Sequence, residues 1–446
     1  MRRTARPARF TSLLAVAALA LAAARAPAAH AGPAEQKYLE EEDDAKAEPL
    51  LAALLAKWKT PKDAADLVKT LRARKAKGDL KKDRGTFDWP CPDGKTRQFT
   101  YLLPSKHAPG KPAGVMVWLH GAVRQGPPGG GAGEAEMFRP AVDDLGMIVV
   151  GPSTYDGVEW GAPGPRALVH HALRVVKTSF AVDENRVFVC GDSDGGRGTY
   201  RTVEAEATTF AAAVPVIGSP GGVTRFVNLR NLPWLVINGA KDTIFDLAHV
   251  REGVDGMKAA GFDLDWRLVD DAGHDPRLFL RFAADVRAFL AKHPRDPYPR
   301  KVEWTVDPSD ADGAARFPAN TFRWIRIDEA GPSERNSSFD DAGVVRGGLP
   351  RVEATRDGNR VVVRTSGVKR VTVLASDQML DLGKDVEVVV NDVVLFRGKV
   401  VPDPRVVLEE GRRFLDRALV FSARISLEVD APAVEAAAPD APPAGK

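Results

Sequence analysis

The sequence predicts an α/β fold, a mostly parallel sheet covered by helices on both faces, followed by a smaller all-β module. Between residues 85 and 295, apolar runs of strand length alternate with amphipathic, helix-like stretches. These runs are almost continuously apolar, as strands buried on both faces must be. After residue 300 the pattern changes to alternating apolar and polar residues with turn signals such as Asp357-Gly358-Asn359, which is typical of antiparallel strands.

The first 31 residues have the composition of a secretory signal peptide. Four arginines precede the apolar run 12–24, and Ala29-His30-Ala31 is a small-x-small cleavage site. The apolar run is too short to span a bilayer. We therefore expect an exported protein, periplasmic or extracellular, with no stable membrane insertion once the leader is removed. A membrane anchor or a disordered Ala-rich start is the alternative.

Removal of this leader changes the charge balance. The whole chain has 63 basic and 60 acidic residues, but five of the arginines lie in the leader, which leaves 58 basic residues and a net charge of −2. A near-neutral surface gives no electrostatic reason to expect nucleic acid as a partner. The only cysteines are Cys91 and Cys190, and although export permits a disulfide, a small buried thiol is the simpler expectation for Cys190.

The rest of the chain divides into four predicted parts. Residues 32–84 are charged and helical in pattern and form a short lead-in. Residues 85–295 form the α/β part, residues 300–429 form a β-rich accessory module, and the Ala/Pro-rich tail 430–446 is expected to be disordered. The expected strands of the α/β part include 115–119, 147–150, 187–190, 211–217, 234–237 and 264–269.

The stretch CGDSDGGRG (190–198) contains the spacing G-x-S-x-G around Ser193, which is typical of the nucleophile turn of serine hydrolases. A strand-like run precedes it and a helix-like segment follows, as that turn requires. Glycines at 191 and 195 fit because larger side chains would collide across the turn. The alternative, a calcium loop starting at Asp192, fails at its fifth, sixth and twelfth positions, and no nucleotide-phosphate or zinc motif is present. We expect no metal and no cofactor.

Two further residues complete a triad in the chain order Ser–Asp–His. Asp242 directly follows one strand-like run, and His274, in the segment DAGHDP, follows the next. Because ligands in open parallel sheets collect at the carboxyl ends of the strands, these side chains can converge on Ser193. Asp246 is the reserve carboxylate.

An acyl-transfer reaction also needs N–H donors for the developing oxyanion. One is expected from Asp194, the residue after the serine. The other is expected from Ala122, in the loop that follows the strand-like run of WLHGAV (118–123). His120 in the same loop is expected to have a structural role.

With these motifs identified, the run VDENRVFVCGDSDGGRG, together with VWLHGA upstream and INGAKD and DAGHDP downstream, resembles secreted α/β-hydrolases of the polyhydroxyalkanoate-depolymerase, feruloyl-esterase and acetylxylan-esterase group. The resemblance covers about residues 95–293. It implies an α/β-hydrolase fold and hydrolysis of polysaccharide-linked or polyester carboxylic esters through an acyl-enzyme. By motif match the resemblance assigns the nucleophile, the base, the orienting carboxylate and the two oxyanion donors to Ser193, His274, Asp242, Ala122 and Asp194.

The sequence departs from this group at Asp194, where a small or neutral residue is usual. An ionised carboxylate some 6 Å from the oxyanion would oppose catalysis by about 3 kcal/mol at an effective dielectric near 20, which is a factor of about a hundred in rate. The repulsion is relieved if the side chain points away, pairs with a cation such as Arg197, or is protonated.

Two other functions stay open. A serine peptidase of the prolyl-oligopeptidase type would use the same triad, but that class usually has a β-propeller before the hydrolase, and only about fifty residues are available here. A non-catalytic hydrolase-like protein for adhesion or surface assembly is the second alternative, which Asp194 favours and the complete triad opposes. In either case the β-rich module is a candidate for contact with a cell surface or with polysaccharide.

Overall fold

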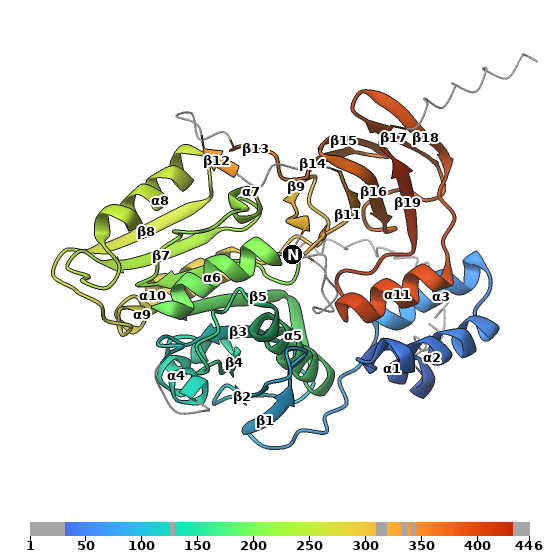
Figure 1. Ribbon diagram of the computed structural model, residues 1–446. Coiled ribbons are helices and arrows are strands. Elements are labelled where there is room, and N and C mark those ends of the chain that lie inside the picture. The colour runs from blue at the N-terminus through green and yellow to red at the C-terminus, as the bar shows by residue number, and fades with distance from the viewer. Residues whose placement is uncertain (1–31, 125–129, 309–318, 332–336, 340–344, 431–446) are drawn as a thin grey trace, which may run out of the picture.

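The computed structural model describes residues 32–124, 130–308, 319–331, 337–339 and 345–430. The predicted signal peptide lies outside these ranges, as does all but the first residue of the predicted tail. A large sheet flanked by helices occupies one side of the molecule, and smaller sheets and a helical cluster lie beside it (Figure 1). Among the helices of these ranges, none combines the length and apolar character that a membrane span requires.

The large sheet has eight strands in the order β1-β2-β4-β3-β5-β6-β7-β8. The first two strands pair antiparallel at one edge, and β3 to β8 run parallel to one another. This order is that of the α/β-hydrolase fold, so the predicted fold class is confirmed. The strands are β1 (Arg84–Pro90), β2 (Thr96–Leu102), β3 (Ala113–Leu119), β4 (Ile148–Pro152), β5 (Val182–Asp192), β6 (Ala213–Val216), β7 (Trp234–Gly239) and β8 (Leu264–Val269).

Helices cover both faces of this sheet, and β3 shows why its sequence is apolar throughout. Successive side chains of a strand point to opposite faces. Val115 and Val117 of β3 belong to one buried cluster, whereas Met116 and Trp118 belong to the cluster on the other face. The covering helices are α4 (Gly130–Phe138), α5 (Pro163–Ser179), α6 (Asp194–Ala205), α7 (Phe226–Leu229), α8 (Leu247–Ala259), α9 (Leu278–Arg281) and α10 (Ala283–Lys292).

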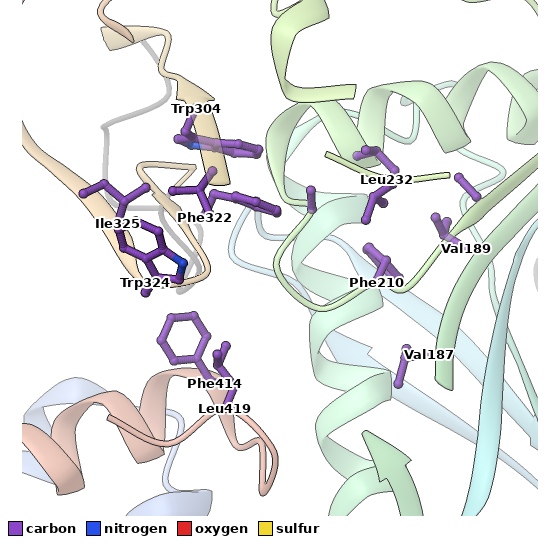
Figure 2. Close-up of a cluster of buried hydrophobic side chains, with 14 of the residues drawn as sticks. Val187, Val189, Phe210, Leu232, Trp304, Phe322, Trp324, Ile325, Phe414 and Leu419 are labelled. Atoms are coloured by element: carbon purple, nitrogen blue, oxygen red, sulfur yellow. The ribbon is translucent and has the colours of Figure 1, made fainter. Parts of the chain in front are cut away.

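The C-terminal part is built mainly of β-strands, arranged as a five-stranded sheet, a four-stranded sheet and a short two-stranded one. Its core is continuous with that of the large sheet. Figure 2 shows Val189 and Phe210 of the hydrolase part and Trp304 and Phe322 of the C-terminal part, which belong to the same buried cluster. The strands are β9 (Lys301–Thr305), β10 (Thr321–Phe322), β11 (Ile325–Ala330), β12 (Ser337–Phe339), β13 (Val345–Gly347), β14 (Arg351–Asp357), β15 (Arg360–Ser366), β16 (Val368–Ala375), β17 (Asp385–Val390), β18 (Val393–Lys399) and β19 (Ala423–Glu428).

One helix departs from the all-β expectation for this part. α11 (Pro404–Phe414) begins after Asp403, whose carboxylate accepts a hydrogen bond from the N–H of Arg405. It packs against the three N-terminal helices α1 (Pro33–Glu40), α2 (Asp44–Lys57) and α3 (Pro61–Arg72), with which it shares a separate buried cluster. Its apolar side is therefore covered by residues more than 300 positions away in sequence, and no local strand pattern could indicate this contact.

Candidate active site

Ser193 lies on a sharp turn between β5 and α6, with φ 53° and ψ −119°. A residue with a side chain rarely adopts a positive φ, and such strain is found mainly at functional sites. The flanking glycines make the turn possible. A Cβ at position 195 would overlap the carbonyl oxygen of Leu119, and one at position 191 would lie 2.5 Å from the carbonyl oxygen of Gly195. The turn therefore presents the serine side chain beyond the carboxyl edge of the sheet.

The structure brings the three residues of the predicted triad into one hydrogen-bonded chain. Ser193 Oγ lies 2.9 Å from His274 Nε2, and His274 Nδ1 lies 2.8 Å from Asp242 Oδ2. The second oxygen of Asp242 accepts hydrogen bonds from the N–H groups of Ile244 and Phe245, which fixes the orientation of the carboxylate. With Nδ1–H directed at a carboxylate, Nε2 is the acceptor for the serine hydroxyl.

Asp246, the reserve carboxylate, does not take part in this chain. Its side chain is 64% exposed, and it accepts a hydrogen bond from the N–H of Ala248 at the start of α8. It is therefore an N-cap residue.

Of the two expected oxyanion donors, Asp194 directly follows Ser193, and Ala122 follows Gly121, whose backbone lies close to Ser193. The Asp194 N–H is the first of α6, where backbone N–H groups have no partner within the helix and form the positive end of its dipole. Ala122 has a φ of 51°, a strained value for a residue with a side chain. In the part of the chain that the structure describes, neither N–H has a hydrogen-bond acceptor. Gly121 permits the close approach, because a Cβ there would lie 3.0 Å from Ser193 Cβ.

The Asp194 carboxylate has a partner that the sequence did not indicate. Its Oδ2 accepts a hydrogen bond from the backbone N–H of Val123, at 3.0 Å. Arg197, the cation suggested from the sequence, instead lies 3.5 Å from Glu159. The side chain next to the nucleophile thus fastens the loop that carries the second oxyanion donor.

His120 also contacts the loop that carries Ala122, through hydrogen bonds of its ring. The Nε2 of its buried ring accepts from the N–H of Thr154 at 2.9 Å, which leaves Nδ1–H to donate to the carbonyl of Gly121 at 2.6 Å. The ring stacks on Tyr155 with a centroid separation of 3.9 Å. Burial lowers the pKa of His120 to about 4, so the imidazole is neutral over the physiological range. This histidine positions backbone and is separate from the triad.

Sequence reasoning missed a buried pair of carboxyl groups beneath the turn. Asp192 and Glu134 hydrogen-bond to each other, and the indole N–H of Trp118 lies 3.1 Å from an oxygen of each. Burial and the neighbouring Glu134 raise the pKa of Asp192 well above its usual range, so this pair shares a proton. Glu134 lies on α4, and no sequence spacing links it to the serine motif. The one signal in the sequence is an acidic residue, Asp192, at the end of an otherwise apolar strand-like run.

No cluster of three or more potential metal ligands occurs in the described ranges. Cys91 and Cys190 are both buried and unpaired.

Comparison with known proteins gives a likeness of fold. No protein-family model matches this chain, and no curated protein matches it in sequence. Among solved structures, a thermostable esterase is 19% identical with a TM-score of 0.42, over 48% of this chain and 64% of that one. A poly(3-hydroxybutyrate) depolymerase from Bordetella parapertussis is 18% identical over 48% of this chain and 91% of its own, with a TM-score of 0.39. A ferulic acid esterase is 19% identical over 47% and 97%, with a TM-score of 0.39.

Proposed function

We propose that this protein is an exported serine hydrolase that cleaves carboxylic esters, with polysaccharide-linked acyl groups or a polyester as the substrate class. The observation that carries the proposal is the continuous hydrogen-bonded chain from Ser193 through His274 to Asp242, set on a strained turn between a strand and a helix. The strained turn matters because hydrogen-bonded Ser, His and Asp side chains also occur in polar clusters that have no catalytic role. The ester specificity and the substrate class come from the sequence resemblance.

The geometry supports a two-step acyl transfer. Ser193 Oγ attacks the ester carbonyl carbon while His274 Nε2 takes the hydroxyl proton, and Asp242 stabilises the imidazolium that forms. The N–H groups of Asp194 and Ala122 stabilise the oxyanion of the tetrahedral intermediate. His274 then gives its proton to the departing alcohol oxygen, which leaves an acyl group on Ser193. A water molecule attacks this ester with His274 again as base, and the carboxylic acid is released.

A peptidase of the prolyl-oligopeptidase type is the second candidate, because it would use the same triad. The described residues before β1 form the three helices α1, α2 and α3. The sequence resemblance favours the esterase. Export is proposed from the leader sequence, and contact of the β-rich part with polysaccharide or a cell surface is proposed from its position as an accessory to the hydrolase.

The test is covalent labelling with a fluorophosphonate probe, with the adduct mapped by mass spectrometry. We expect labelling at Ser193 in the wild type, none in Ser193→Ala, and unchanged labelling in Ser219→Ala. Ser219 is a matched control because it is a loop serine whose hydroxyl accepts a hydrogen bond from the N–H of Gly221 and, among the described residues, contacts no histidine. An unlabelled wild type contradicts the proposal. Turnover of peptide anilides without turnover of p-nitrophenyl esters would favour the peptidase, and N-terminal sequencing of exported protein should begin at Gly32.

A further inference from the structure

We propose that Glu134 is a positioning residue of the oxyanion hole, where it fixes the Ala122 donor by holding the backbone N–H of Gly121. Glu134 lies on α4, a helix that carries no member of the triad, and it acts through the loop that carries Ala122. The inference rests on the proposed function, because Ala122 is an oxyanion donor only if Ser193 attacks an acyl group.

The loop that carries Ala122 is held at a backbone N–H group on each side of this residue. The N–H of Gly121 donates to Glu134 Oε2 over 3.3 Å, and the N–H of Val123 donates to Asp194 Oδ2 over 3.0 Å. Ala122 lies between these two bonds with a φ of 51°, a value that a residue with a side chain seldom adopts without support. The two acceptors therefore fix the neighbouring peptide groups and leave the N–H of Ala122 for the oxyanion.

The bond to Gly121 is charge-assisted, because Glu134 is the ionised member of a buried carboxyl pair. Burial and the charge of Glu134 raise the pKa of Asp192 well above its ordinary value, so Asp192 keeps its proton and donates it to Glu134. Burial raises the pKa of Glu134 too, but the bonds from Asp192, the Trp118 indole and the Gly121 N–H oppose this rise. A hydrogen bond to an ionised acceptor is roughly twice as strong as one between neutral groups.

The position of Glu134 is set by close packing of α4 on two strands of the large sheet. A Cβ at Gly151 of β4 would lie 2.3 Å from the carbonyl oxygen of Gly131, so glycine is needed where α4 crosses this strand. One turn after Glu134, the Phe138 ring stacks on Trp118 of β3 at a centroid separation of 4.0 Å. Residues four apart lie on the same side of a helix. Glu134 and Phe138 therefore contact the same tryptophan, on the strand that leads into the loop.

The loop also lies directly against the carboxyl pair and the nucleophile. A Cβ at Gly121 would lie 2.9 Å from Asp192 Oδ2 and 3.0 Å from Ser193 Cβ. A shift of the pair would therefore displace the loop relative to Ser193. The oxyanion forms only as the reaction proceeds, so loss of Glu134 should weaken stabilisation of the transition state and leave ground-state binding of the substrate unchanged. A lower kcat at an unchanged KM is the expected signature.

Three variants separate this positioning role from a general effect on the fold. Glu134→Ala removes the acceptor, so kcat for a p-nitrophenyl ester should fall about tenfold at an unchanged KM. Glu134→Gln keeps an oxygen that can accept from Gly121 and an amide that can donate to Asp192, so kcat should stay within about twofold of the wild type. Glu136→Ala is the matched control. The Glu136 side chain is 48% exposed and contacts Arg84, so kcat should be unchanged.

A second measurement reports on the loop without requiring turnover. Amide hydrogen exchange in peptides that cover residues 119–124, followed by mass spectrometry, should be at least about tenfold faster in Glu134→Ala than in the wild type and in Glu134→Gln. If the wild type neither hydrolyses an ester nor reacts with the fluorophosphonate probe, the proposed function fails. The exchange rates then still show whether Glu134 holds the loop, so the two failures are distinguishable.

A fall in kcat in Glu134→Ala that Glu134→Gln restores, together with faster exchange of the loop, supports the proposal. Exchange at the wild-type rate in Glu134→Ala overturns it, whatever the activity. Equal kcat in the wild type and Glu134→Ala also overturns it, as does an equal loss in the Ala and Gln variants. If Glu134→Ala does not fold, Glu134→Asp replaces it, because a carboxylate one methylene shorter cannot reach both Asp192 and Gly121. Wild-type kcat and exchange in Glu134→Asp would then overturn the proposal.

Discussion

The carboxylate of Asp194 accepts a hydrogen bond from the backbone N–H of Val123, over 3.0 Å. This bond joins the residue after the proposed nucleophile to the loop that carries Ala122, so the two expected oxyanion donors are held by one side chain. An acid at this position would repel an oxyanion if it were unpaired. The observed contact gives Asp194 a positioning role and partly offsets its charge.

Substitution of Asp194 separates these two effects. Asp194→Asn keeps an oxygen that can accept from Val123 but removes the charge, so we expect kcat to equal or exceed that of the wild type, by at most about a hundredfold. Asp194→Ala removes the acceptor, so the loop loosens and kcat should fall about tenfold relative to the Asn variant. Steady-state hydrolysis of a p-nitrophenyl ester at neutral pH measures both. An equal decrease of kcat in both variants, relative to the wild type, would show that the carboxylate charge itself is needed.

The buried Asp192–Glu134 pair predicts a pH dependence of stability. The pKa of Asp192 is raised in the folded protein, so protonation of its carboxyl group stabilises the fold. This stabilisation is complete below a pH of about 3.9, the pKa of an aspartate in the unfolded chain. It is lost as the pH rises through the pKa in the folded protein. Asp192→Asn cannot lose a proton there and can still donate to Glu134. We expect the free energy of unfolding of the wild type, relative to this variant, to decrease with rising pH by at most about 1.4 kcal/mol per pH unit. Urea denaturation of both proteins between pH 4 and 8 measures this difference, and parallel curves contradict the shared proton.

Asp242 orients His274, and its amide variant tests this role. Asp242→Asn should lower kcat by about 10³–10⁴-fold with little change in fold, because an amide can stabilise the wrong imidazole tautomer and cannot stabilise the imidazolium. Asp246→Asn is the matched control. Asp246 lies four residues away and caps α8, and asparagine caps a helix equally well, so kcat should be unchanged. If Asp246→Asn lowered kcat as much as Asp242→Asn does, the assignment of Asp242 as the orienting carboxylate would be contradicted.

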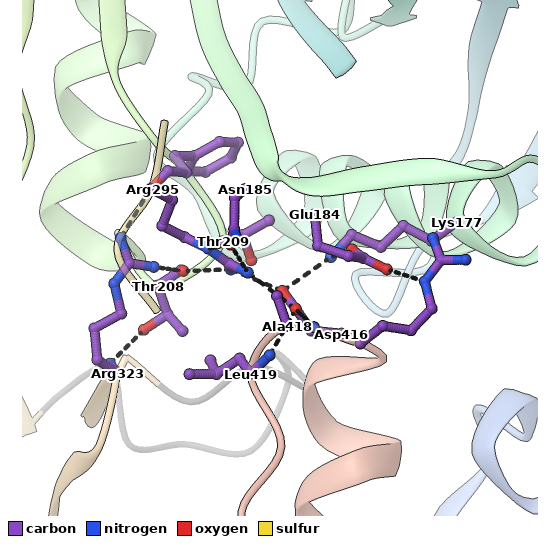
Figure 3. A network of polar contacts seen from close by, with 12 residues as sticks. Lys177, Glu184, Asn185, Thr208, Thr209, Arg295, Arg323, Asp416, Ala418 and Leu419 are labelled. Carbon is purple, nitrogen blue, oxygen red and sulfur yellow. Dashed lines mark hydrogen bonds and ion pairs between the residues drawn. The ribbon is translucent and has the colours of Figure 1, made fainter. Parts of the chain in front are cut away.

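Asp416 ties the C-terminal part to the hydrolase part. Its buried carboxylate pairs with Arg295 and Lys177 and accepts from the N–H groups of Ala418 and Leu419. Asp416→Asn would leave the buried Arg295 without its carboxylate and Lys177 with Glu184 alone (Figure 3), so we expect a loss of about 3–5 kcal/mol in the free energy of unfolding. Chemical denaturation measures it. Asp357→Asn is the control, because it removes an exposed pair with Arg300, and it should unfold at the wild-type midpoint. Equal midpoints for the wild type, Asp416→Asn and Asp357→Asn would exclude a stabilising role for Asp416.

Much of the architecture was readable from local patterns. The continuous apolar runs indicated strands buried on both faces, and the structure has parallel strands over these segments. The helix α11 was not foreseen, although Asp403-Pro404 is a recognisable helix start. Its neighbours in sequence are strands, and its apolar face is covered by the N-terminal helices, so the local context favoured the wrong element.

What the sequence by itself determined is the position of each motif relative to its own strand: Ser193 on a strand–turn–helix junction, and Asp242 and His274 just beyond strand ends. Periodicity and turn chemistry depend on neighbouring residues, so they can be read locally. The tertiary structure decided which groups the acidic residues beside Ser193 contact: Val123 for Asp194 and Glu134 for Asp192. These contacts join segments distant in the chain, and only packing of the whole fold places their charges and hydrogen bonds within reach of one another.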